Sequence, residues 1–127
     1  MNIKPHILIV DDHYSMVKTL ADILSAKGFQ VYTASTGKEA LQILQSQPTD
    51  ILLTDIKMPD MNGLSLFQKA NELQPNLVTY FMTAYSTENI IQQGMQEGVT
   101  TVLTKPLDID FLLRLLYSYT AVDDSQR

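Results

Sequence analysis

The chain has 127 residues, of which 45% are apolar, and its 9 Lys and Arg against 14 Asp and Glu give a net charge of −5. This length and apolar content predict one domain with a core of its own. The acidic balance and the lack of a basic run argue against nucleic-acid binding through phosphates. Because there is no cysteine, disulfides, thiolate catalysis and Cys-ligated zinc are excluded.

Neither a membrane span nor a secretion signal is expected from the sequence. No apolar stretch approaches the roughly 20 residues that a membrane-spanning helix needs. Polar residues and Pro5 precede only a short apolar run at the N-terminus, which is not the layout of a signal peptide. We therefore expect a cytoplasmic location.

Five short runs have the composition of β-strands, and helical patterns alternate with them. The runs are Ile3–Val10, Gln30–Ala34, Asp50–Thr54, Leu77–Met82 and Thr101–Thr104. The first and third are nearly all Ile, Leu and Val, which is typical of parallel strands buried on both faces. Four helices between the runs are expected to end at Gly28, Pro48, Pro75 and Gly98. The alternation predicts an α/β domain with a parallel sheet and right-handed crossovers.

The last predicted helix runs from about Leu107 to Tyr119, so we expect a domain of residues 1–120 and a C-terminal tail of residues 121–127. Apolar residues cover well over half of the circumference of this helix. A helix needs an apolar stripe only somewhat wider than ~100° to meet its own core. The excess favours a partner surface, for a homodimer or an output module, over a face covered by the tail.

Polar residues follow four of the five strand runs. Asp11 and Asp12 follow the first run, Asp55 the third, Thr83 the fourth and Lys105 the fifth. Because ligands of open α/β sheets bind beyond the carboxyl ends of the strands, three carboxylates, a hydroxyl and an ammonium should gather at one edge. Adjacent carboxylates repel each other, and a hard cation such as Mg²⁺ would offset that repulsion.

Each of these residues also has a purely structural explanation when it is taken alone. The two adjacent acids suit a helix start, Asp55 suits the opening of a turn, Thr83 suits a helix cap, and Lys105 could be a solvated lysine before a proline. Such roles explain the whole set poorly. His6 and His13 share no pattern with each other, and we expect surface or helix-start histidines there rather than ligands.

The set resembles the receiver domain of bacterial two-component response regulators, over nearly the whole chain from Ile7 to about Leu116. The family pattern is an acidic pair after strand one, a phospho-accepting Asp after strand three, Thr or Ser after strand four, and Lys-Pro after strand five. Here the matching residues are Asp11-Asp12, Asp55 within Thr54–Gly63, Thr83-Ala84 and Lys105-Pro106. The resemblance implies a flavodoxin-like fold, a doubly wound five-stranded parallel sheet with helices on both faces.

The resemblance implies that Asp55 takes a phosphoryl group from a sensor histidine kinase or a histidine phosphotransfer protein. It also implies a Mg²⁺ site, with Asp12 as a direct ligand, Asp11 as a ligand through water, and Asp55 and the backbone carbonyl of Lys57 completing the protein ligands. The domain would act as a switch in two-component signal transduction. Its only catalysis would be its own phosphorylation and dephosphorylation.

The same resemblance assigns the phosphoryl oxygens to Lys105, to the Thr83 hydroxyl and to the Ala84 N–H, and it makes the Lys105–Pro106 bond a candidate cis peptide. One position departs from the family pattern. Val102 stands where receivers often carry a switching Tyr or Phe, and a β-branched residue cannot swing as a ring does.

Three further interpretations concern residues beside this set. Tyr80 or Tyr85 could replace the missing aromatic, although packed tyrosines are the simpler explanation. Lys57 and Tyr85, two residues after Asp55 and Thr83, are expected to shield the acyl phosphate from water. Two rival functions stay open, a phosphate-independent interaction module and a Mg²⁺-dependent phosphohydrolase. The sequence also leaves open whether the natural protein is a stand-alone receiver or a larger regulator.

Overall fold

Strands and helices alternate strictly along the part of the chain that the computed structural model describes, residues 4–84 and 88–125. In chain order the elements are β1 (His6–Val10), α1 (Tyr14–Ala26), β2 (Gln30–Ala34), α2 (Gly37–Ser46), β3 (Ile51–Asp55), α3 (Gly63–Leu73), β4 (Val78–Thr83), α4 (Glu88–Glu97), β5 (Thr101–Thr104) and α5 (Ile109–Ser125). The strands form one parallel sheet in the order β2-β1-β3-β4-β5. The predicted flavodoxin-like α/β fold is therefore confirmed.

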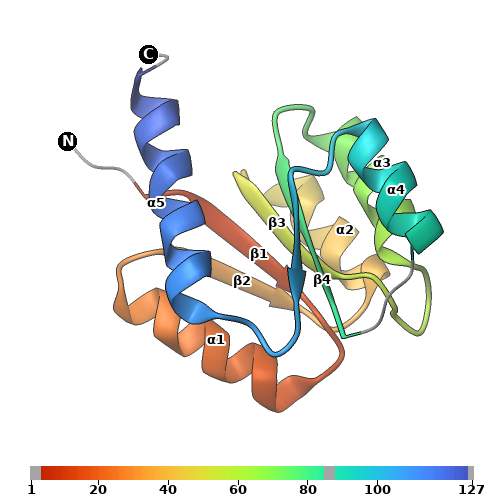
Figure 1. Ribbon diagram of the computed structural model, residues 1–127, viewed down its shortest axis with the longest axis horizontal. Helices are drawn as coiled ribbons and strands as arrows, with labels where there is room; N and C mark the ends of the chain where they lie inside the picture. The colour runs from red at the N-terminus through yellow and green to blue at the C-terminus, as the bar shows by residue number, and fades with distance from the viewer. Residues whose placement is uncertain (1–3, 85–87, 126–127) are drawn as a thin grey trace.

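The helices cover the sheet on two faces, with α1 and α5 on one side and α2, α3 and α4 on the other (Figure 1). β1 and β3 lie side by side in the middle of the sheet, and Val10 pairs with Thr54. Because both faces of these strands are covered, their apolar side chains are almost completely buried, as the continuous apolar runs predict. Between these two strands the chain order reverses, which is where an open α/β sheet presents its ligand crevice.

Most element boundaries follow from single residues. Gly28 and Gly98, with φ of 96° and 120°, adopt the left-handed conformation that ends α1 and α4. β1 begins only at His6, because Pro5 has no N–H to donate to the ladder. α5 continues to Ser125, beyond the predicted end at Tyr119, because the chain holds no glycine or proline after that residue. The division into residues 1–120 and 121–127 stays a prediction.

Within the described residues, no helix combines the length and the apolar content that crossing a bilayer requires.

Candidate functional site

The three predicted acids meet at the carboxyl edge of the central strands. Asp11 and Asp12 follow β1, and Asp55 is the last residue of β3. One side-chain atom from each of these acids and one from His13 all lie within 4.8 Å of one another. Asp11 and Asp55 are buried, whereas the side chain of Asp12 is 42% exposed. Three carboxylates this close, one of them open to solvent, provide the hard oxygen donors that Mg²⁺ prefers.

Lys105 contacts two of these carboxylates. Its Nζ lies 2.5 Å from Oδ2 of Asp11 and 3.1 Å from Oδ2 of Asp55. Burial alone would lower the pKa of Lys105, but its hydrogen bonds to Asp11 and Asp55 outweigh burial and raise that pKa. Likewise burial would raise the pKa of Asp11, whereas hydrogen bonds from Lys105 and His13 outweigh it and lower that pKa. Lys105 and Asp11 are therefore both held in their charged forms.

The remaining predicted residues line the same hollow as Asp55. This open cavity of about 610 Å³ is lined by Asp12, His13, Ser15, Met16, Asp55, Lys57, Thr83, Ala84 and Lys105. The backbone N–H of Lys57 points to Oδ1 of Asp55 at 3.4 Å, and the N–H of Lys105 donates to the Thr83 carbonyl at 2.8 Å. The Lys105–Pro106 peptide is cis, as the resemblance suggests. Ends of four strands thus contribute to one cavity large enough for a phosphoryl group.

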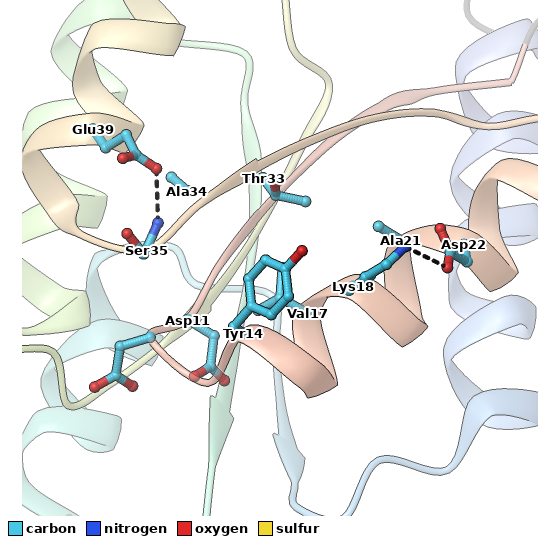
Figure 2. A pocket seen from close by; sticks show the side chains of 11 residues that line it. Asp11, Tyr14, Val17, Lys18, Ala21, Asp22, Thr33, Ala34, Ser35 and Glu39 are labelled. Atoms are coloured by element: carbon cyan, nitrogen blue, oxygen red, sulfur yellow. Dashed lines mark hydrogen bonds and ion pairs between the residues drawn. The ribbon is translucent and has the colours of Figure 1, made fainter.

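A second hollow of about 350 Å³ lies on the other side of the acidic pair, between α1 and the β2–α2 segment. Figure 2 shows Tyr14 standing in it, with Thr33 and Ser35 across from the helix. It shares Asp12 with the first hollow and is also lined by Asp11, but no residue from β3, β4 or β5 lines it. It therefore lacks the predicted phosphoryl acceptor and its cation.

The segment between β3 and α3 is fixed to α2 by a residue that sequence reasoning missed. The carboxylate of Asp60 accepts hydrogen bonds from the N–H groups of Gly37 and Lys38, at 3.0 and 2.9 Å. A Cβ on Gly63 would lie 2.7 Å from the carbonyl oxygen of Asp55, so the start of α3 abuts the backbone of Asp55 directly. Asp60 could not be recognised beforehand because its partners precede it by more than 20 residues.

His13 lies at the start of α1, as expected, but its ring contacts the acidic pair. Its Nδ1 is 2.9 Å from Oδ1 of Asp11 and 3.3 Å from Oδ1 of Asp12. The hydrogen bond with Asp11, followed by the charges of Asp11 and Asp12, raises the pKa of His13. Position 13 directly follows the two acids in the sequence, and this adjacency was the available signal. His6 instead packs edge-on against Tyr32 at the far end of β1.

Val102 and Tyr80, which were considered for a switching role, are not among the residues that line the hollow containing Asp55. Val102 pairs with Phe81 in the sheet and packs, partly buried, against a cluster that includes Ile56. Tyr80 is buried in the core, and burial raises the pKa of its hydroxyl. It is therefore a packed tyrosine, as the simpler explanation expects. Tyr85 lies outside the described residues. That Lys57 and Tyr85 shield an acyl phosphate from water stays a prediction.

Comparisons with known proteins agree with this geometry. Residues 7–117 match the family model described as the response regulator receiver domain. The chain is 35% identical over 126 residues to the transcriptional regulatory protein GlrR of Escherichia coli, covering 98% of this chain and 27% of that regulator. It is also 35% identical over 104 residues to the sporulation initiation phosphotransferase F of Bacillus subtilis, covering 82% of this chain and 84% of that protein.

Among solved structures, a CheY-like response regulator receiver domain protein from Methanospirillum hungatei superposes with a TM-score of 0.91 at 27% identity. That match covers 98% of this chain and all of the other. That receiver domain thus has the same fold as this chain over almost its whole length.

Proposed function

Because this chain belongs to the response regulator receiver domain family of two-component signalling systems, we propose that Asp55 is its phospho-accepting residue. The observation that carries the proposal is the pairing of Asp55 with Lys105 inside the hollow that also receives Thr83 and Ala84. A carboxylate oxygen of Asp55 would form a bond to phosphorus as the phosphorus–nitrogen bond of a phosphohistidine breaks. The imidazole leaves with the electron pair and takes up a proton.

We propose that the cations of the site offset the charge of the transferring group. Lys105 would exchange part of its contact with Asp55 for a phosphoryl oxygen. The Thr83 hydroxyl and the Ala84 N–H would donate to the other oxygens. Catalysis of this kind depends on position and electrostatics more than on covalent chemistry by the protein.

Mg²⁺ would be held by Asp12 directly, by Asp11 through water, and by Asp55 and the backbone carbonyl of Lys57. When bound it would neutralise negative charge on the phosphoryl group. The mutual approach of the carboxylates to within 4.8 Å supports this assignment. Because the buried Asp11 is paired with Lys105, the more exposed Asp12 would be the most accessible ligand.

The donor would be a sensor histidine kinase or a histidine phosphotransfer protein, and the output would be a change in partner binding. Since the chain spans 27% of the length of the GlrR regulator that it matches, any output activity is part of this proposal. Phe111 and Tyr117 on α5 are 42% and 43% exposed, which supports α5 as the partner surface. Light scattering with and without phosphorylation would test for a homodimer there.

Phosphorylation is tested by incubating the protein with acetyl phosphate and Mg²⁺ and measuring the intact mass. We expect a single phosphoryl adduct that requires Mg²⁺ and is lost in Asp55→Asn. The matched control is Asp22→Asn, because Asp22 is an exposed aspartate of α1 outside the hollow. A label that persists in Asp55→Asn would refute the assignment.

Two other outcomes would favour the rival functions. If no adduct forms and the phosphate mimic beryllofluoride also fails to bind, a phosphate-independent interaction module becomes the better explanation. Sustained release of phosphate from a small phosphoester, at many turnovers per protein, would favour a phosphohydrolase. Neither outcome is expected from the arrangement of Asp55 and Lys105.

A further inference from the structure

The position of His13 has a consequence for the choice of metal ion. The residue occupies the cap position of α1, yet its side chain makes no hydrogen bond to that helix. The ring is turned to the acidic pair instead and lines the hollow that contains Asp55. With 71% of its side chain exposed, it is free to move by the small amounts that ligand binding requires.

The two oxygens of Asp11 have different partners, and only Oδ2 is in contact with Lys105. Lys105 contacts Oδ2, whereas His13 contacts Oδ1. A metal ion on the Oδ1 side could thus be bound by Asp11, Asp12 and the imidazole without displacing the lysine. The same ring nitrogen lies 3.3 Å from Oδ1 of Asp12.

The donor set is mixed, with three carboxylates and one imidazole whose ligand atoms lie within 4.8 Å of one another. Zinc bonds to nitrogen and oxygen are about 2.0–2.2 Å long, so the ligand atoms of a tetrahedral site stand roughly 3.3–3.6 Å apart and the cluster would have to contract by roughly 1 Å. Mg²⁺ takes oxygen ligands and gains little from an imidazole. Zn²⁺, Ni²⁺ and Cu²⁺ bind imidazole well.

We propose that His13 is a metal ligand that lets this pocket bind a borderline divalent cation, with Zn²⁺ as the representative, in competition with Mg²⁺. The proposal rests on the proposed function in that both ions use the same carboxylates. With Asp55 as the fourth ligand beside Asp11, Asp12 and His13, a tetrahedral zinc site would be complete and would leave no open position. A phosphoryl oxygen therefore has no place on the ion, and zinc occupancy blocks phosphorylation of Asp55.

Calorimetric titration of Zn²⁺ into the protein tests the ligand directly, without any need for phosphorylation. We expect His13→Gln to bind Zn²⁺ at least about tenfold more weakly than the unsubstituted protein, since loss of a mere supporting group already costs roughly 10- to 100-fold. Its affinity for Mg²⁺ should stay within about twofold, because Mg²⁺ keeps oxygen ligands. His6→Gln is the matched control, since His6 is the only other histidine, and it should bind Zn²⁺ normally.

A second measurement follows the consequence for phosphorylation. At fixed Mg²⁺, rising Zn²⁺ should suppress acetyl phosphate labelling of the unsubstituted protein and of His6→Gln, and should suppress labelling of His13→Gln only at concentrations about tenfold higher. Equal Zn²⁺ affinity in the His13→Gln and unsubstituted proteins would overturn the inference. Failure of labelling without Zn²⁺ would instead refute the proposed function, and the calorimetric comparison would still decide the role of His13. Thermal melts of each variant establish that it is folded.

Discussion

The first turns of α1 and α2 differ in whether side chains accept hydrogen bonds from their backbone N–H groups. Each helix begins with N–H groups that have no partner inside the helix. At α2 the Thr36 hydroxyl accepts from the Glu39 N–H at 3.1 Å, and the Glu39 carboxylate accepts from the Ser35 N–H at 2.9 Å. This pair is a variant of the capping box, in which the Glu39 carboxylate accepts from the residue before the cap. Asp60 adds two further acceptors from the β3–α3 segment, so the start of α2 is closely satisfied.

At α1 the side chain of His13 contacts the acidic pair and does not cap the helix. His13 makes no side-chain capping bond, and its ring and its N–H both contact Oδ1 of Asp11. The first turn contains no acidic residue to favour the helix dipole. Local rules of helix capping are thus obeyed where only stability is required and are broken beside the candidate site, which is where such exceptions are expected.

Removing Lys105 should have the largest effect, because it leaves Asp11 buried without its main cation. We expect Lys105→Met to lower the free energy of unfolding by about 2–3 kcal/mol at pH 7 without Mg²⁺, since breaking a buried pair leaves one charge unpaired. Urea unfolding measures this change. The matched control is Lys18→Met in the exposed Lys18–Asp22 pair, for which less than about 0.5 kcal/mol is expected. Equal losses in both variants would show that the edge behaves like ordinary surface.

Asp60→Ala should come next, because it removes both acceptors that the β3–α3 segment offers to α2. The expected loss of unfolding free energy is about 1–2 kcal/mol, against about 1 kcal/mol for the comparison variant Thr36→Ala. Hydrogen exchange separates the two, because only Asp60→Ala should speed exchange at the N–H groups of Gly37 and Lys38. Unchanged exchange at both amides would contradict the role given to Asp60.

Installing an ordinary cap at α1 should produce a smaller effect of opposite sign. Asn is among the best capping residues, so His13→Asn should raise the free energy of unfolding by about 0.5–1 kcal/mol. Thermal and urea unfolding in metal-free buffer would measure the gain. A destabilised variant would mean that the contact between the ring and Asp11 stabilises the protein more than a helix cap does. The starts of the two helices would then differ less in the stability that their side chains contribute.

The smallest expected effect is a pH dependence specific to His13. Its pKa in the folded protein is raised above the ordinary value of 6.5, so the protonated ring stabilises the folded state. That stabilisation is complete below pH 6.5 and is lost as the pH rises through the folded-state pKa. We therefore expect a slight fall in unfolding free energy just above pH 6.5 in metal-free protein. His13→Asn should lack this fall, and an identical pH profile in both proteins would argue against the contact.

The sequence predicts the strands and the strand-end residues because their signals are local. The apolar runs of β1 and β3, the glycines at 28 and 98, and the order of polar residues after the strands all depend on near neighbours in the chain. Parallel strands then bring those ends together without further information. The assignment of Mg²⁺ ligands and phosphoryl contacts stays a prediction, since it depends on groups that bind only with the ion and the phosphate.

The contacts of His13 and Asp60 were not predicted, for two different physical reasons. The direction of the His13 ring depends on side-chain rotation at a helix start, which neither spacing nor composition determines. The partners of Asp60 come from a helix that begins more than 20 residues earlier. The length of α5 was underestimated because nothing in the chain after Tyr119 stops a helix and the polar residues there suggested a tail.

The contact between Gly63 and the backbone of Asp55 affects how such chains should be recognised. A side chain at position 63 would collide with the Asp55 carbonyl at 2.7 Å and with the Cα of Ile56 at 3.0 Å, so even alanine would push the end of β3 out of place. A search for distant relatives that checks only the acids, the hydroxyl and the lysine would accept chains in which the backbone at the matching aspartate is deformed. Requiring glycine at this position as well would add a steric criterion to the chemical one.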